Sequence, residues 1–176
     1  MRKRTMNKKE HDEILLERAG ESSRELLFRL LQYSLYEESG TDGNEMNENG
    51  LFDYPWFDAY FSEPGREAWL IRNGGGKLLG FAMVNEHMQK VSRGHSIAEF
   101  MILPGCRRKG AGSEAARLCF ETHRGNWEVS PAAGSSRAKQ FWDSVISHYT
   151  SGRYELCDGI FSFFTDESDR TEGERP

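Results

Sequence analysis

One short segment of the sequence has the residue types that bind an anion. It reads Arg107-Arg108-Lys109-Gly110-Ala111-Gly112 and lies between an apolar stretch that ends at Leu103 and a stretch with helical periodicity. A helix N-terminus offers unpaired N–H groups and partial positive charge, and glycine lets a phosphate approach the backbone closely. The segment therefore predicts a phosphate-binding turn, for which the plain alternative is a glycine-rich turn with a solvated basic face.

Two familiar phosphate loops do not fit this segment. A Walker A loop that began at Gly105 would need Gly-Lys-Ser/Thr where this chain has Gly-Ala. Residues 110–115 match the dinucleotide pattern G-x-G-x-x-A, and Glu128 lies near the acidic position that this pattern expects. That pattern, however, places its first glycine directly after a strand. Here six residues separate Leu103 from Gly110, and little chain remains for the rest of a doubly wound domain.

Composition and charge exclude several other classes. The 176 residues suffice for one compact domain, and the net charge of −5 argues against a general nucleic-acid or anionic-membrane binder. No apolar run approaches the ~20 residues of a membrane span. The three cysteines are an odd number without C-x-x-C spacing, which favours neither disulfides nor a zinc site. We therefore expect a cytoplasmic protein with no metal, no nucleic-acid partner and no membrane partner.

The elements around the segment follow from hydrophobic periodicity. Ser22 and Glu25 form an S-x-x-E capping box before leucines at helical spacing, which predicts a helix that ends near Ser39-Gly40. Residues 41–50 are predicted as a loop, and the aromatic-rich stretch 51–61 as containing a short helix. The other expected elements are a strand at 14–16, a hairpin of 67–72 with 77–85, a strand at 96–103, a helix at 115–122, a strand at 127–129, a helix at 138–146 and a hairpin of 154–156 with 160–164.

This order predicts a mixed α/β (α+β) fold without an internal repeat. We expect a single domain over residues 12–164. Residues 1–11 are polar and basic and are predicted to form a flexible tail. Residues 165–176 are charged and non-periodic, so they are predicted to be disordered.

The motif Arg107-x-x-Gly110-x-Gly112 resembles the pyrophosphate loop Q/R-x-x-G-x-G/A of the GCN5-related N-acetyltransferases, the GNAT superfamily. Ile102-Leu103-Pro104 is similar to the apolar-x-Pro that commonly ends the family's fourth strand, and residues 135–142 resemble its N-x-x-A-x-x-x-Y segment. The resemblance covers roughly residues 13–164. The stretch 48–145 also looks like a subgroup described only as predicted acetyltransferases.

The resemblance implies a mostly antiparallel central sheet flanked by helices, with splayed fourth and fifth strands. It also implies acetyl-CoA as the acetyl donor and direct attack by an amine in a ternary complex. The loop amides from Arg107 to Gly112 would hold the pyrophosphate, and Ser135, at the position often held by Asn, would bind the cofactor or cap a helix. The backbone of the preceding strand would bind the pantetheine arm through Met101, Ile102 and Leu103.

The same resemblance suggests catalytic candidates. Glu99 lies on the strand beside the thioester and would serve as general base, although a partly buried carboxylate paired with a neighbour is the plain alternative. Glu86 and His87 are weaker candidates. The family's usual acid is a tyrosine where this chain has Trp142, and Tyr149 is a weak substitute about two helical turns further along.

The acceptor-binding wall of the family would fall on the aromatic and acidic stretch that contains Asp53, Tyr54 and Phe57. Such a wall would suit a cationic amine, so the expected acceptor is a small-molecule or peptide amine. A homodimer is left open by the exposed late strands. A non-catalytic acyl-CoA-binding or regulatory module on the same fold is the alternative function.

Overall fold

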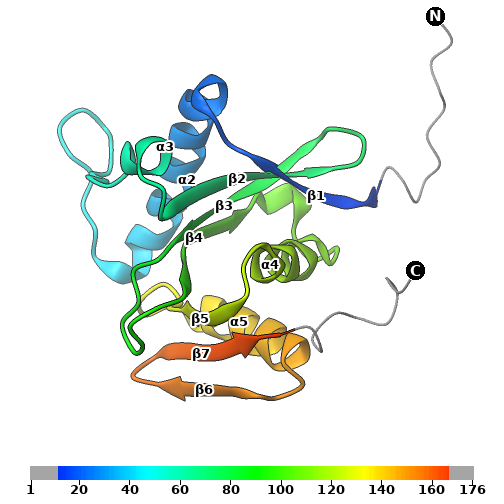
Figure 1. Ribbon diagram of the computed structural model, residues 1–176. Coiled ribbons are helices and arrows are strands. Elements are labelled where there is room, and N and C mark those ends of the chain that lie inside the picture. The colour runs from blue at the N-terminus through cyan, green and yellow to red at the C-terminus, as the bar shows by residue number, and fades with distance from the viewer. Residues whose placement is uncertain (1–11, 167–176) are drawn as a thin grey trace, which may run out of the picture.

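A seven-stranded sheet forms the centre of the computed structural model, which describes residues 12–166. Its strand order is β1-β2-β3-β4-β5-β7-β6, and every neighbouring pair is antiparallel except β4 and β5 (Figure 1). This confirms the predicted mixed, mostly antiparallel sheet. The strands are β1 (Ile14–Arg18), β2 (Arg66–Asn73), β3 (Leu78–Asn85), β4 (His95–Ile102), β5 (Gly125–Val129), β6 (Tyr154–Cys157) and β7 (Ile160–Thr165). The helices are α2 (Arg24–Asp42), α3 (Ala59–Ser62), α4 (Ala111–Thr122) and α5 (Ser136–Tyr149), with single 3-10 turns at Glu21–Ser23 and Pro104–Cys106.

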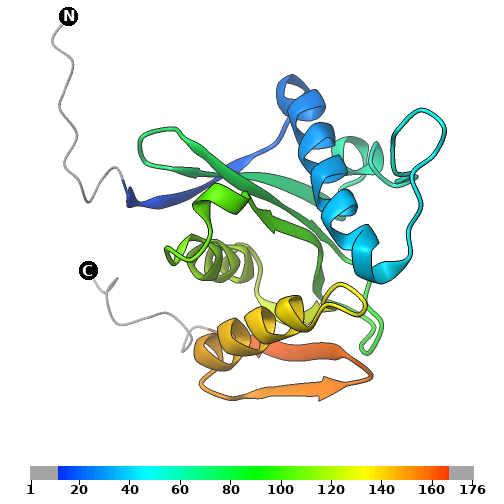
Figure 2. The same cartoon turned by 180° about the vertical axis from the view of Figure 1, so that it is seen from behind.

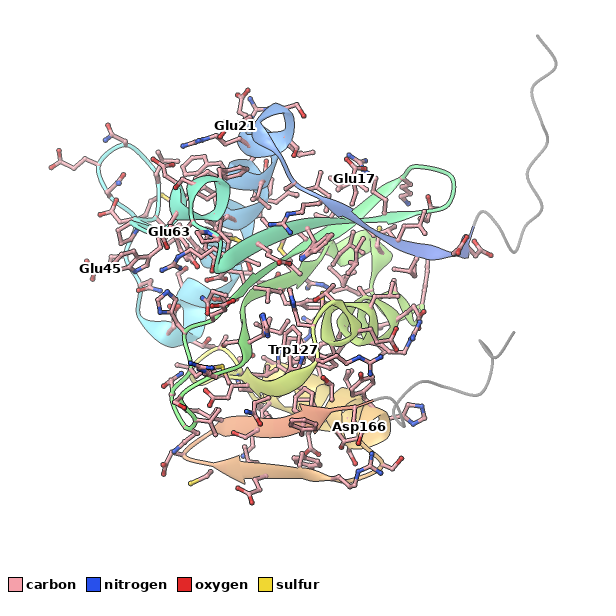
Figure 3. All side chains as sticks on the ribbon, viewed as in Figure 1. Glu17, Glu21, Glu45, Glu63, Trp127 and Asp166 are labelled. Carbon is pink, nitrogen blue, oxygen red and sulfur yellow. The ribbon has the colours of Figure 1, made fainter. Side chains whose placement is uncertain are left out.

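The helices cover both faces of the sheet. Leu27 and Leu31 of α2 pack with Phe81 and Met83 of β3 on one face. The aromatic core of the other face lies under α4 and α5 and includes Trp127 of β5, which is labelled in Figure 3. Trp127 contacts Phe120 with 5.4 Å between ring centroids. Side chains of this size each stabilise the fold by about 1.5–3 kcal/mol when fully buried.

The parallel pair β4 and β5 separates soon after it begins. Only three residue pairs join the two strands, His95–Ile97 with Trp127–Val129. Beyond them β4 continues to Ile102, whereas β5 ends. On the β3 side the register shifts by one residue at Ala98, a bulge of the kind that bends a strand. The strands therefore splay as predicted, and the second half of β4 keeps an edge without a strand partner.

The C-terminal end of α2 and the loop before α5 lie side by side beyond this edge (Figure 2). A Cβ atom on Gly134 would lie 3.0 Å from the carbonyl oxygen of Thr41. Two segments separated by about ninety residues of sequence thus meet opposite the unpaired part of β4.

Three details of the sequence interpretation were wrong. The predicted capping box of Ser22 with Glu25 does not form, because a 3-10 turn precedes α2 and the reciprocal hydrogen bonds join Gly20 to Ser23. Helix α2 also continues to Asp42, past the predicted end. Thr165 was assigned to the disordered end, but it is the last residue of β7, buried, and donates a hydrogen bond to the His123 carbonyl at 3.1 Å.

Other expectations concern the rest of the chain. The predicted tail at 1–11 and residues 167–176 lie outside the described residues. All three cysteines are free, Cys106 and Cys119 in the interior and Cys157 on the surface. Within residues 12–166, no helix is both long and apolar enough to cross a bilayer.

Candidate functional site

A cavity of about 550 Å³ lies at the unpaired edge of β4. Its walls come from the C-terminal half of α2, the end of β4, the loop before α4 and the first turns of α5. The cavity is therefore bounded by the segments that the splay of β4 and β5 separates. It contacts part of the anion-binding segment predicted from sequence, including Arg108, Gly110 and Gly112.

The loop before α4 contains a run of backbone amides without protein acceptors within residues 12–166. Arg108 (φ 61°) and Gly110 (φ 81°) both adopt the left-handed region, and the first helical bond runs from the Glu114 amide to the Gly110 carbonyl at 3.1 Å. In the described part of the chain, the amides of residues 108–113 donate to no protein acceptor. Such a row of amides at a helix N-terminus binds anions.

The two glycines of the motif have different physical roles. Gly110 supplies the left-handed N-cap of α4, a conformation that costs an L-residue about 1–2 kcal/mol. Gly112 instead allows close packing, since a Cβ atom there would lie 3.2 Å from the Phe141 ring and 3.4 Å from Ile102. The motif thus fixes the loop geometry and also the fit between α4 and α5.

Arg107 departs from the prediction that the loop amides from Arg107 to Gly112 hold the pyrophosphate, because its amide donates to the Pro104 carbonyl at 3.3 Å and its side chain is bonded within the protein. Its Nε donates to the Ile102 carbonyl at 2.6 Å, and Nη1 and Nη2 donate to the two carboxylate oxygens of Glu37 at 2.6 and 2.5 Å. The Arg107 guanidinium lowers the pKa of Glu37 through these bonds. The side chain of Arg107 is therefore occupied within the protein, while Arg108 and Lys109 form no ion pair within the described residues.

The strand backbone expected to bind pantetheine needs a correction. The Leu103 amide donates to the Leu79 carbonyl at 2.8 Å, so this residue pairs with β3. Backbone groups alternate in direction along an antiparallel strand. Met101 therefore also points toward β3, whereas Phe100 and Ile102 point toward the opening. Of the three predicted residues, Ile102 alone directs its backbone there, and Arg107 already uses its carbonyl.

Ser135 begins α5 at the cavity wall. Its Oγ accepts a hydrogen bond from the Ala138 amide at 3.1 Å, which makes it the N-cap of the helix. Ser135 also lines the cavity, so both of the roles weighed from sequence are compatible with its position. The neighbouring Arg137 lines the cavity as well, 3.9 Å from the Glu37 carboxylate.

Carboxyl groups gather at the α2 side of the cavity. Glu99 lies on the same face of β4 as Met101, close to Glu38 and Asp42 of α2. Burial first, and then the nearby charges of Glu38 and Asp42, raise the pKa of Glu99 to about 8, although a hydrogen bond with Tyr54 opposes the rise. Burial also raises the pKa of Glu38, which lines the cavity directly.

The remaining predicted acceptor residues are dispersed. Phe57 is buried in the core against Phe28 and Phe61. Asp53 is exposed and accepts a hydrogen bond from Asn47 at 2.8 Å. Neither of these predicted residues lines the cavity, and of the three only Tyr54 reaches its acidic side, through Glu99.

Of the two residues considered as general acid, one lines the cavity and the other does not. Trp142 lines the cavity and packs edge-on against Phe100 at 5.1 Å. Tyr149 lies at the far end of α5, where it packs against Phe120 at 5.2 Å and not against the cavity.

The weaker base candidates lie near the end of β3. His87 contacts a guanidinium nitrogen of Arg66 at 2.6 Å, and Glu63 pairs with the same side chain at 2.8 Å. Glu86 lies 3.9 Å from His95. Neither Glu86 nor His87 borders the cavity.

Sequence reasoning missed three charged residues of the cavity wall, Glu37, Glu38 and Arg137. The two glutamates were part of the polar face of a predicted helix, and nothing local distinguishes them from solvated charges. The only usable signal was their position near the end of that helix. No group of three His, Cys, Asp or Glu side chains in residues 12–166 is arranged to hold a metal ion.

One end of the cavity thus offers unpaired amides and cations, and the other offers carboxyl groups. The first can bind an anion such as a pyrophosphate, and the second can hold or deprotonate an ammonium group. This pairing matches the donor and acceptor sides of an acyl-transfer reaction.

Comparisons with known proteins agree with this geometry. The sequence model of the acetyltransferase (GNAT) family matches residues 32–142. A mycothiol acetyltransferase of Saccharopolyspora erythraea is 30% identical over 79 residues, which are 45% of this chain and 26% of that protein. The matched segment thus spans only about a quarter of that relative.

Solved structures share the fold at low sequence identity. An acetyltransferase from Thermus thermophilus gives a TM-score of 0.65 at 15% identity, over 87% of this chain and 97% of the other. Spermidine N-acetyltransferase from Vibrio cholerae, in complex with CoA and spermine, gives a TM-score of 0.57 at 9% identity, over 86% and 95%. Since the family match covers more than half of the chain and includes most of the cavity wall, the protein is an acetyltransferase of the GNAT family.

Proposed function

We propose that this enzyme transfers the acetyl group of acetyl-CoA to a primary amine of a cationic acceptor, by direct attack within a ternary complex. The observation that carries the proposal is the row of unpaired amides at residues 108–113, which begins α4 beside the splayed edge of β4. The first N–H groups of a helix have no intrahelical acceptor, and an anionic ligand would supply the missing acceptors here.

The donor fits the basic end of the cavity. The amides of residues 108–113 would hold the pyrophosphate, with Arg108 and Lys109 as the loop cations that form no ion pair within residues 12–166. The Ile102 amide and the backbone groups of Phe100, which point toward the opening, are the strand groups that would bind the pantetheine arm. These residues bind and orient the donor, because an extended thioester needs support along its length.

Glu99 is the group we assign as general base. A neutral amine forms the new C–N bond at the thioester carbonyl, the C–S bond breaks, and the amine proton passes to Glu99. A pKa of about 8 suits this task, since a base works best when its pKa lies near the operating pH. Glu99 lies behind the cavity wall, so the proton reaches it directly or through one water molecule.

The departing thiolate would take its proton from solvent. Trp142 occupies the place of the family's usual tyrosine, and an indole N–H is far too weak an acid for proton donation. Tyr149 lies away from the cavity. A thiol pKa near ~8.5 makes the thiolate a tolerable leaving group without a protein acid.

Charge at the acceptor end supports a cationic acceptor. Glu38 borders the cavity, and Asp42 lies one helical turn further along the same face of α2. A protonated second amine on the acceptor would be attracted to these groups while the reacting amine loses its proton. Spermidine, the acceptor named for the Vibrio cholerae enzyme, belongs to this class of amine.

A panel of amines tests the proposal. Acetyl-CoA and the enzyme are mixed with a triamine, a diamine or a monoamine of similar length, and thiol release is followed. We expect kcat/KM to fall in that order, by about tenfold for each lost positive charge near a partly buried carboxylate. Thiol release that no amine accelerates above the rate of acetyl-CoA alone would contradict the proposal.

A further inference from the structure

The side chain of Arg107 joins three segments at the mouth of the cavity. Its Nε is bonded to the Ile102 carbonyl at the end of β4, and its two terminal nitrogens hold both carboxylate oxygens of Glu37 on α2. Glu37 and Arg107 are 70 residues apart in sequence. A bidentate, charge-assisted pair of this geometry is among the stronger polar contacts in proteins and fixes orientation as well as distance.

The contact between Arg107 and Glu37 lies directly before the residues with left-handed backbone conformation in the loop. Arg107 closes the 3-10 turn at Pro104–Cys106, and the next residue, Arg108, already has φ 61°. A non-glycine residue in that region costs energy and persists only when its surroundings hold it. The three bonds of Arg107 provide such a hold immediately before the unpaired amides begin.

The positive charge of Arg107 and the negative charge of Glu37 neutralise each other. Arg107 is only 19% exposed, and its partner Glu37 removes its positive charge from the field of the loop. Glu37 also lies 3.9 Å from Arg137. If the site recognised its anion through charge alone, a carboxylate in this position would weaken binding.

We propose that Glu37 is a positioning residue for the donor site, which acts through Arg107 to hold the loop 107–113 against the end of β4. In this arrangement the amides face the cavity before the donor arrives, and Arg107 is a structural clasp and not a phosphate ligand. The identity of the ligand rests on the proposed function. The clasp itself rests on the contacts described above.

The two possible roles of Arg107 predict opposite changes in CoA affinity for the substitution Glu37→Ala. If Arg107 binds the phosphates directly, Glu37→Ala frees its guanidinium and removes a negative charge, so CoA should bind more tightly. If Glu37 positions the loop, the same substitution should weaken CoA binding by about tenfold, the typical loss for a charged hydrogen-bonded pair. The dissociation constant of CoA, measured by isothermal titration calorimetry, decides between them.

The variants form a double-mutant cycle with a matched control. We expect Glu37→Ala and Arg107→Ala to weaken CoA binding to a similar degree. The double variant should bind CoA no less tightly than the single variant with the lower affinity, because each substitution removes the same interaction. The charge reversal Glu37→Arg with Arg107→Glu should recover part of the affinity. Glu25→Ala, which removes another ion-paired carboxylate of α2 far from the cavity, should leave the affinity unchanged.

Two further readouts separate positioning from loss of fold. KM for acetyl-CoA should rise while kcat at saturating donor stays within about twofold, and the isosteric Glu37→Gln, which keeps one acceptor oxygen, should show a smaller loss. Raising the salt concentration should weaken CoA binding equally in the wild type and in Arg107→Ala, but less steeply in Arg108→Ala.

The proposal is overturned if Glu37→Ala leaves CoA binding unchanged or tightens it, or if the losses in the two single variants add. If the wild type itself does not bind CoA, the proposed function fails, and the cycle is then read from thermal unfolding, where the same coupling of Glu37 and Arg107 is expected. If neither CoA binding nor thermal unfolding shows coupling between Glu37 and Arg107, Glu37 is not a positioning residue for the loop.

Discussion

The two ends of the cavity are built in different ways. The donor end is made from consecutive backbone amides, residues 108–113, whose directions are set by two left-handed residues and the start of α4. The acceptor end is made from side chains that α2, β4 and the loop before α3 bring together, chiefly Glu38, Glu99 and Tyr54. Sequence-local geometry therefore determines the first end, and packing between distant segments determines the second.

This difference predicts how each end responds to substitution. The donor end should respond most to substitutions that change the backbone conformation of the loop, either directly at Gly110 or through loss of the Glu37–Arg107 pair, whereas the acceptor end should respond to the loss of single charges. The following substitutions test that contrast, in order of decreasing effect.

Glu99→Gln should lower kcat by about 10²–10⁴-fold, the usual contribution of a general base, while the dissociation constant of CoA stays within about twofold. Steady-state kinetics and calorimetry on the same preparation measure both. Glu63→Gln, which alters an exposed carboxylate beside Arg66, is the control. Equal kinetics in Glu99→Gln and the wild type would remove Glu99 from the mechanism.

Gly110→Trp should weaken CoA binding by about a hundredfold, because a side chain at φ 81° strains the N-cap and the indole crowds the amides. Gly105→Trp is the matched control, since this glycine of the same loop has no left-handed φ and open space around its Cβ position. Fluorescence titration with CoA measures both variants. If the two lose the same affinity, the backbone explanation of the donor end is wrong.

Glu99→Gln should also stabilise the fold at alkaline pH. The folded-state pKa of about 8 lies above the ordinary value of a glutamate, so the wild type has its full stability in acid and loses stability as pH rises toward 8. Glutamine carries no charge and avoids this loss, a gain of up to about 4–5 kcal/mol at pH 9, since a pKa difference of one corresponds to ~1.4 kcal/mol. Urea unfolding at pH 5 and pH 9 should show the gain only at the higher pH, and a gain of the same size at both would exclude titration of Glu99.

Glu38→Gln should shift the pH profile of acetyl transfer. Glu99 must be ionised to act as a base, so kcat/KM of the wild type should rise up to about pH 8 and then level off. Removing the neighbouring charge of Glu38 should move this rise to lower pH by about one unit, with Asp42 and Tyr54 still acting on Glu99. An unchanged profile, with the same acceptor in both assays, would mean that the two carboxyl groups are not coupled.

The same contrast explains what the sequence could predict. The element order and the loop 107–112 follow from periodicity and from glycine positions, which are local properties. The splay of β4 from β5 was instead expected from the resemblance to the family. Glu37 and Glu38 resembled solvated charges, and their roles became visible only when α2 was placed across β4. The strand backbone was misjudged for a similar reason, because which amides face an opening depends on the pairing register with β3.

Acetyl transfer to spermidine by the wild-type enzyme is the decisive test of the proposed reaction, with free thiol and N-acetylated product counted in the same mixture. We expect one thiol for each acetylated amine, at a rate that saturates with both acetyl-CoA and spermidine. Binding of CoA without any acetylated product, from spermidine or from any other amine of the panel, would contradict the proposed reaction.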